Sequence, residues 1–130
     1  MNAQLDWFHK RLHLYVLALG LVALVVALTV DLPRSRGLYA LIAAGPVIGA
    51  LVTWARYRWA AGDRSMAKIV VECGWVSTSF GLGFLVMLPS RYYAVEPLQK
   101  GVLTLLALAL VALGAYTLYN FAKRGYSLTP

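Results

Sequence analysis

Glu72 is the residue of this sequence with the clearest potential for chemistry. It is the single charged residue in the 20-residue apolar run Ile69–Leu88. A carboxylate placed within hydrocarbon costs about 3 kcal/mol on insertion scales, so such a group is usually paired, protonated or functional. A desolvated carboxylate can also exchange protons near neutral pH, which is the property that proton-coupled transport requires.

Three roles for Glu72 remain open at this point. Lys68 lies four residues earlier on the same helical face, about one turn from the membrane boundary, and could form an interfacial salt bridge with it. The carboxylate could instead line an ion or proton path together with the hydroxyl groups of Ser77, Thr78 and Ser79. It could also hydrogen-bond to a helix of a partner chain.

Asp6, His9 and His13 form a second group, at positions i, i+3 and i+7 of a short segment ahead of the first apolar run. Two imidazoles and a carboxylate on one helical face could ligate a transition metal. The chain has no third histidine, and the site would be fully exposed. We therefore expect these residues to face water on an amphipathic helix, and we expect neither a metal nor another cofactor.

The sequence favours a protein that is not an enzyme. It has one cysteine, Cys73, so it has no internal disulfide and no cysteine-rich metal site. It contains no P-loop, GxSxG, HExxH, paired-carboxylate or dinucleotide-binding signature. Nearly uncharged apolar runs do not supply the polar cluster that catalysis needs.

The elements that would carry these residues are apolar helices. The 130 residues are 61% hydrophobic and only 13% charged, whereas a soluble domain has about a quarter of its residues charged. Apolar runs of 17 to 20 residues recur four times, and each is long enough to cross a bilayer. We expect an all-α polytopic membrane protein, a single domain over residues 1–130 with four transmembrane helices in an antiparallel bundle and a short interfacial helix near residues 5–13. The expected spans are about 14–30, 38–57, 69–88 and 101–121.

Small residues predict where the helices pack. Gly45 and Gly49 form a GxxxG motif around Pro46, which predicts close helix packing and a kink or local unwinding. In the third span, small and polar residues occupy two opposed faces, which predicts that this helix is central in the bundle. One face carries Gly74, Ser77, Thr78 and Gly81, and the other carries Glu72, Ser79 and Gly83.

The basic residues predict the orientation and one class of partner. Eight of the twelve Lys and Arg residues fall on the side that holds both termini, so both termini should be cytoplasmic. The net charge of +7 then suits anionic lipid head groups on that face, and nucleic-acid binding is not expected. The expected location is a multi-pass position in a membrane, most simply a prokaryotic cytoplasmic membrane.

Two functions compete. Many packing features and few reactive groups favour a structural or accessory subunit, assembled with other membrane subunits or with itself through small-residue contacts. The alternative is a small oligomeric ion channel or a proton-coupled transporter that uses the membrane-embedded Glu72.

Overall fold

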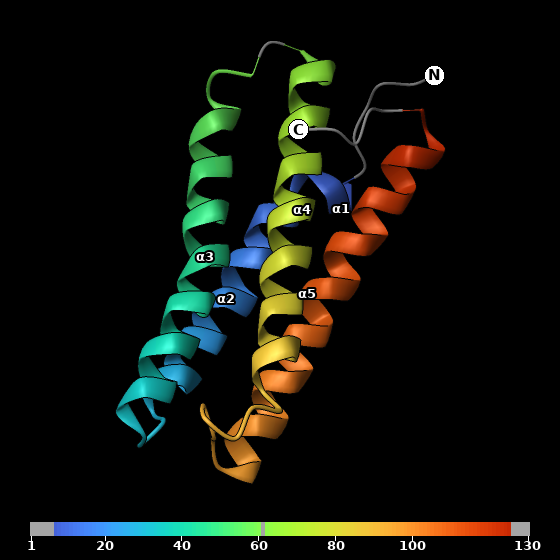
Figure 1. Cartoon of the computed structure of the whole chain (residues 1–130). Helices are drawn as coiled ribbons and strands as arrows, with labels where there is room; N and C mark the ends of the chain where they lie inside the picture. The colour runs from blue at the N-terminus through green and yellow to red at the C-terminus, as the bar shows by residue number, and fades with distance from the viewer. Residues whose placement is uncertain (1–6, 61, 126–130) are drawn as a thin grey trace.

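The computed structural model describes residues 7–60 and 62–125, and every regular element in these two ranges is a helix. The five helices are α1 (Trp7–Lys10), α2 (Leu12–Leu28), α3 (Pro33–Tyr57), α4 (Asp63–Met87) and α5 (Pro97–Lys123). Helices α2 to α5 run alternately up and down and pack as a bundle in which each contacts the next and α5 returns to α2 (Figure 1). The expected all-helical fold is thus confirmed.

Of the helices in the described ranges, three are long and apolar enough to cross a membrane: α3, α4 from Ser65 onward, and α5. They have 23 to 27 residues, and about 20 suffice for the hydrocarbon core. Helix α2 is also apolar but shorter, with 17 residues. Three apolar helices of this length indicate a multi-pass membrane protein.

The helix boundaries lie outside the apolar runs for local reasons. Proline occupies the first position of α3 (Pro33) and of α5 (Pro97), where its fixed φ favours a helix start and its missing N–H costs nothing. Gly62 precedes α4 with a φ of +88° that other residues rarely adopt. Polar residues therefore extend three of the helices beyond the apolar segments that the sequence marks most clearly.

The core of the bundle combines small side chains with large ones. Alanines at positions 23, 27, 43 and 107 are fully buried around Tyr39 and Phe84 near the end where α2 meets α3. Many other large apolar side chains point outward; Leu41, Val86 and Leu105 are each about 70% exposed. An apolar exterior with small residues at the helix contacts is typical of helices that associate in lipid.

The GxxxG glycines of α3 hold side chains of α4. The Phe80 ring lies directly over Gly45, and a Cβ on Gly49 would come within 2.8 Å of Val76 Cγ1. Helix α3 continues without interruption through Pro46, so the local unwinding expected there is not seen. Gly20 of α2 packs against this proline: a Cβ there would lie 3.2 Å from Pro46 Cβ.

The closest backbone approach is between α4 and α5. A Cβ on Gly81 would lie 2.8 Å from the carbonyl oxygen of Ala107, and one on Gly114 would collide with Thr78. The Ser77 hydroxyl donates a 2.7 Å hydrogen bond to the carbonyl of Leu110. Helix α4 therefore packs tightly on α5 through one face, while other residues of α4 contact α3.

Candidate functional site

Glu72 is held by an arginine from the neighbouring helix. Arg56 Nη1 on α3 donates to both carboxylate oxygens of Glu72 on α4, at 2.8 and 3.1 Å. The Glu72 side chain is 23% exposed and the Arg56 side chain 42% exposed. The observed partner is thus Arg56, and the pairing with Lys68 anticipated from the helical spacing is not the ion pair that forms.

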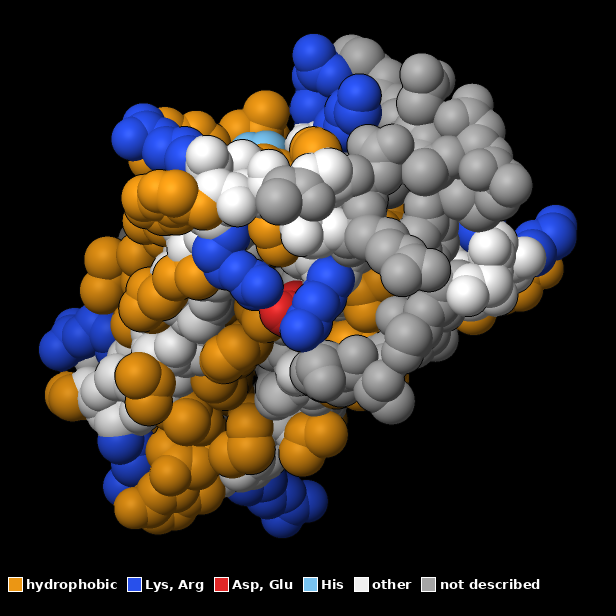
Figure 2. Space-filling view, turned by 90° about the horizontal axis from the view of Figure 1, so that it is seen from above, with side chains coloured by type: hydrophobic (Ala, Val, Ile, Leu, Met, Phe, Trp, Pro, Cys, Tyr) orange, Lys and Arg blue, Asp and Glu red, His pale blue; other side chains and the backbone are white. Residues whose placement is uncertain are grey.

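Figure 2 views the bundle from the end at which α3 and α4 are joined. Acidic side-chain atoms lie there among basic side chains, and apolar side chains cover the flanks. Among the acidic side chains that the structure describes, Glu72 is the one that belongs to this end. The carboxylate therefore lies in a strongly basic setting that neutralises it.

The three hydroxyl groups proposed to accompany Glu72 do not come together with it. Ser77 is fully buried and bonds to α5, and the Thr78 hydroxyl donates to the carbonyl of Gly74 one turn earlier at 2.9 Å. Ser79 is exposed on the outside of α4. Glu72 faces α3, so these side chains do not line one common path within the described bundle.

The two histidines are buried rather than exposed, which corrects the expectation of a water-facing amphipathic helix. His9 is 1% exposed and His13 is 7% exposed. The His9 ring packs edge-on against Phe121 of α5 with centroids 5.0 Å apart, whereas the His13 ring packs edge-on against Tyr57 of α3, also at 5.0 Å. The third candidate ligand, Asp6, lies outside the described residues. The two rings face different helices, and no group of three potential metal ligands occurs among the residues described.

A compact polar cluster surrounds His13 at this end of the bundle. The Nδ1 atom of His13 and the hydroxyl of Tyr57 are both buried without a hydrogen-bond partner in the structure. The Cys73 thiol of α4 lies near the Tyr57 hydroxyl and beside the Thr53 hydroxyl of α3, which itself donates to the carbonyl of Gly49 at 2.8 Å. Histidine, tyrosine and cysteine thus meet next to the Arg56–Glu72 ion pair.

The chemistry open to this cluster is limited. A buried polar group without a partner costs about 1–3 kcal/mol, so His13 and Tyr57 are places where a water molecule would be bound. The thiol of Cys73 is 2% exposed. The arrangement can therefore hold a buried water molecule between the imidazole and the phenol.

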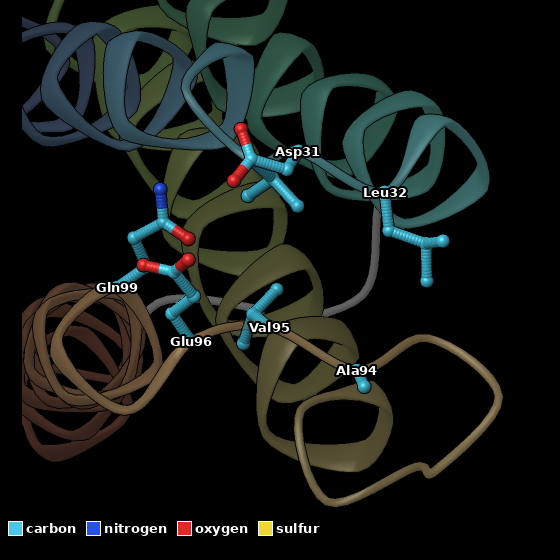
Figure 3. A pocket seen from close by; sticks show the side chains of 7 residues that line it. Asp31, Leu32, Ala94, Val95, Glu96 and Gln99 are labelled. Atoms are coloured by element: carbon cyan, nitrogen blue, oxygen red, sulfur yellow. The ribbon is translucent and has the colours of Figure 1, made fainter.

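The opposite end of the bundle has a shallow hollow of about 260 Å³ between the α2–α3 and α4–α5 connections (Figure 3). The carboxylates of Asp31 and Glu96 line it from these two connections, together with Gln99 of α5. The Gln99 side-chain amide donates to the carbonyl and the hydroxyl oxygens of Thr29, at 3.0 and 2.8 Å. Sequence analysis gave no indication of this hollow, because it depends on how two loops meet.

Side chains of α3 fasten the α4–α5 connection at the same end. The buried Tyr39 hydroxyl lies 2.8 Å from the carbonyl oxygen of Met87 and 2.9 Å from that of Tyr93. Arg34 donates to the carbonyl of Tyr92 at 2.9 Å and stacks over its ring. These contacts tie α3 to the connection across the end of the bundle, and they serve structure rather than chemistry.

Comparisons with known proteins place the chain in no family: no family model, no curated protein and no solved structure matches it significantly.

Proposed function

We propose that this chain is a four-span integral membrane protein that acts, without catalysis, as a structural or accessory subunit of a membrane complex or homo-oligomer. Residues 14–30, which comprise α2 from Leu14 onward with Thr29 and Val30, would be the fourth span: 17 residues extend about 26 Å as a helix. Four crossings suit the arrangement in which α1 and the end of α5 lie near the same end of the bundle (Figure 1).

We place this end in the cytoplasm, in a prokaryotic cytoplasmic membrane. The basic side chains described there include Arg56, Arg58 and Lys123, and the guanidinium of Arg58 stacks over Trp54 at 4.3 Å. Arginine and tryptophan together favour the head-group region, and anionic lipids on the cytoplasmic leaflet attract the cations. Anionic lipids are therefore the first partners of this surface.

The single observation that supports an assembly role is a polar position on the outside of α4. Ser79 is exposed in the middle of an apolar helix and forms no hydrogen bond in the structure. Gly83 follows one turn later, and a Cβ there would meet only Ile42, at 3.8 Å. Most other small-residue contacts are used within the chain, whereas Ser79 and Gly83 leave a small-xxx-small surface open to a neighbouring helix.

The test is the oligomeric state of the purified protein in lipid nanodiscs or mild detergent, measured by chemical crosslinking and light scattering. We expect a defined oligomer or a co-purified membrane subunit, and we expect Ser79→Leu and Gly83→Leu to abolish it. Gly101→Leu is the matched control, because nothing lies within 4 Å of a Cβ at Gly101. A stable, monodisperse monomer without partners would count against the proposal.

The alternative function, a channel or proton-coupled carrier based on Glu72, has its own test. Reconstituted liposomes would be assayed for proton and ion flux with the native chain and with Glu72→Gln. Because Arg56 neutralises Glu72, we expect no flux that depends on this carboxylate. Flux that disappears in Glu72→Gln while the variant remains folded would favour the alternative.

A further inference from the structure

The N-terminal segment of residues 7–13 packs against the end of the bundle at which α3 and α4 are joined. Its α1 helix ends at Lys10, and α2 begins at Leu12 after a turn at Arg11. His9 and His13 pack on the rings of Phe121 and Tyr57, and the fully buried Leu12 shares a core cluster with Cys73 of α4. The segment is therefore seated between α3 and α5 like a plug.

His13 is the titratable group at the centre of this plug, and its surroundings favour the neutral imidazole. From α3 it meets the Tyr57 ring, and the charged groups at this end of α3 are Arg56 and Arg58. From α4 the facing groups are the neutral thiol of Cys73 and Glu72, which already accepts both hydrogen bonds from Arg56. From α5 the charged groups at this end are Lys123 and Arg124, and from its own segment Lys10 and Arg11.

We propose that residues 7–13 form an acid-sensitive plug, which leaves the end of the bundle when His13 gains a proton. An imidazolium at this position would lie among apolar and aromatic groups, and the one described carboxylate at this end is already bound to Arg56. The added charge would also be repelled by the basic residues of the same end. Exposure of His13 relieves both penalties, so protonation and undocking are coupled. This inference is independent of the proposed subunit function.

The direction of the pH dependence follows from linkage. His13 lies just before the proposed span of residues 14–30. Burial lowers the pKa of its imidazole from the ordinary value of 6.5. The undocked segment consequently binds more protons than the docked segment at acid pH. Docking is at full strength above pH 6.5 and weakens as the pH falls from 6.5 toward the lower pKa of the docked imidazole.

The single cysteine is a native probe of this movement. Cys73 is 2% exposed in the core cluster to which Leu12 of the plug contributes, so departure of the segment opens this cluster to a small thiol reagent. The experiment measures the rate at which 4,4′-dithiodipyridine, which reacts with thiols even in acid, labels the full-length protein in detergent or liposomes. The rate is divided by that for the denatured protein at each pH, which removes the intrinsic pH dependence of the thiol.

We expect the normalised rate to rise severalfold between about pH 7.5 and about pH 5, because protonation of His13 favours the undocked segment. In His13→Phe, Cys73 should stay protected at both pH values. Lys10→Gln changes an exposed residue of the same segment and should leave the acid-induced increase in labelling rate intact. Circular dichroism verifies folding, and His13→Gln replaces the phenylalanine variant if that one does not fold. A rate that does not change with pH, or an increase that persists without His13, overturns the proposal.

Discussion

Arg56 on α3 donates hydrogen bonds to both carboxylate oxygens of Glu72 on α4, at 2.8 and 3.1 Å. The ion pair thus links two consecutive helices of the bundle. The pair lies at one end of the bundle, where both side chains keep some contact with the outside. It explains how an otherwise apolar helix accommodates its single carboxylate. It also leaves the interior of the bundle, as described, without an acidic side chain.

The first prediction concerns this ion pair. Arg56→Met leaves a half-buried carboxylate without a partner, and we expect it to lower the free energy of unfolding by about 1–2 kcal/mol. Adding Glu72→Met should recover most of this loss, because the unpaired charge is removed. Reversible SDS unfolding of the two single variants and the double variant forms the cycle that measures the coupling. If the losses of the two single variants add up to the loss of the double variant, the pair has no energetic coupling.

The second prediction concerns the contact between α4 and α5. Gly114→Ala places a methyl group against Thr78 and against the carbonyl oxygen of Gly74, where the rigid backbone cannot move aside. We expect a loss of about 1–3 kcal/mol in the free energy of unfolding. Gly101→Ala, on the same helix with open space around it, should be neutral or stabilising by up to about 1 kcal/mol. Unfolding curves check both, and equal stability of the two variants would contradict the observed packing.

The third prediction concerns the opposite end. Tyr39→Phe removes a buried hydroxyl that bonds to the carbonyls of Met87 and Tyr93, and both acceptors then lose this partner. We expect about 1–3 kcal/mol of destabilisation and faster hydrogen exchange in residues 88–96. Tyr92→Phe is the control, because its exposed hydroxyl forms no hydrogen bond in the structure. Unchanged exchange in Tyr39→Phe would exclude the fastening role of Tyr39.

The sequence predicted the helices well because apolar length is a local property. Each expected span overlaps one of α2 to α5, and the short helix ahead of the first span corresponds to α1. The boundaries were less accurate: α3 begins at Pro33, five residues before the expected start at residue 38, because polar residues near the membrane surface remain helical.

The contacts of the candidate site were harder to predict, because they join residues that are distant in the sequence. Lys68 was the partner that helical spacing could suggest for Glu72, while Arg56 is brought near by the packing of α3 on α4. The burial of His9 and His13 depends on the aromatic rings of Phe121 and Tyr57. Aromatic residues lie close to both histidines in the sequence, and this was the available signal.

The proposed topology requires that all four of α2 to α5 cross the bilayer, and the short α2 is the helix for which crossing is least certain from length. Single-cysteine variants built on Cys73→Ser test this directly. Each variant carries a cysteine at Asp31, Arg58, Ser90 or Lys123 and is labelled in intact cells with a membrane-impermeant maleimide. The account predicts that Asp31→Cys and Ser90→Cys react from outside, and that Arg58→Cys and Lys123→Cys react only after the membrane is permeabilised. Labelling of Asp31→Cys and Arg58→Cys from the same side would contradict the four-span topology.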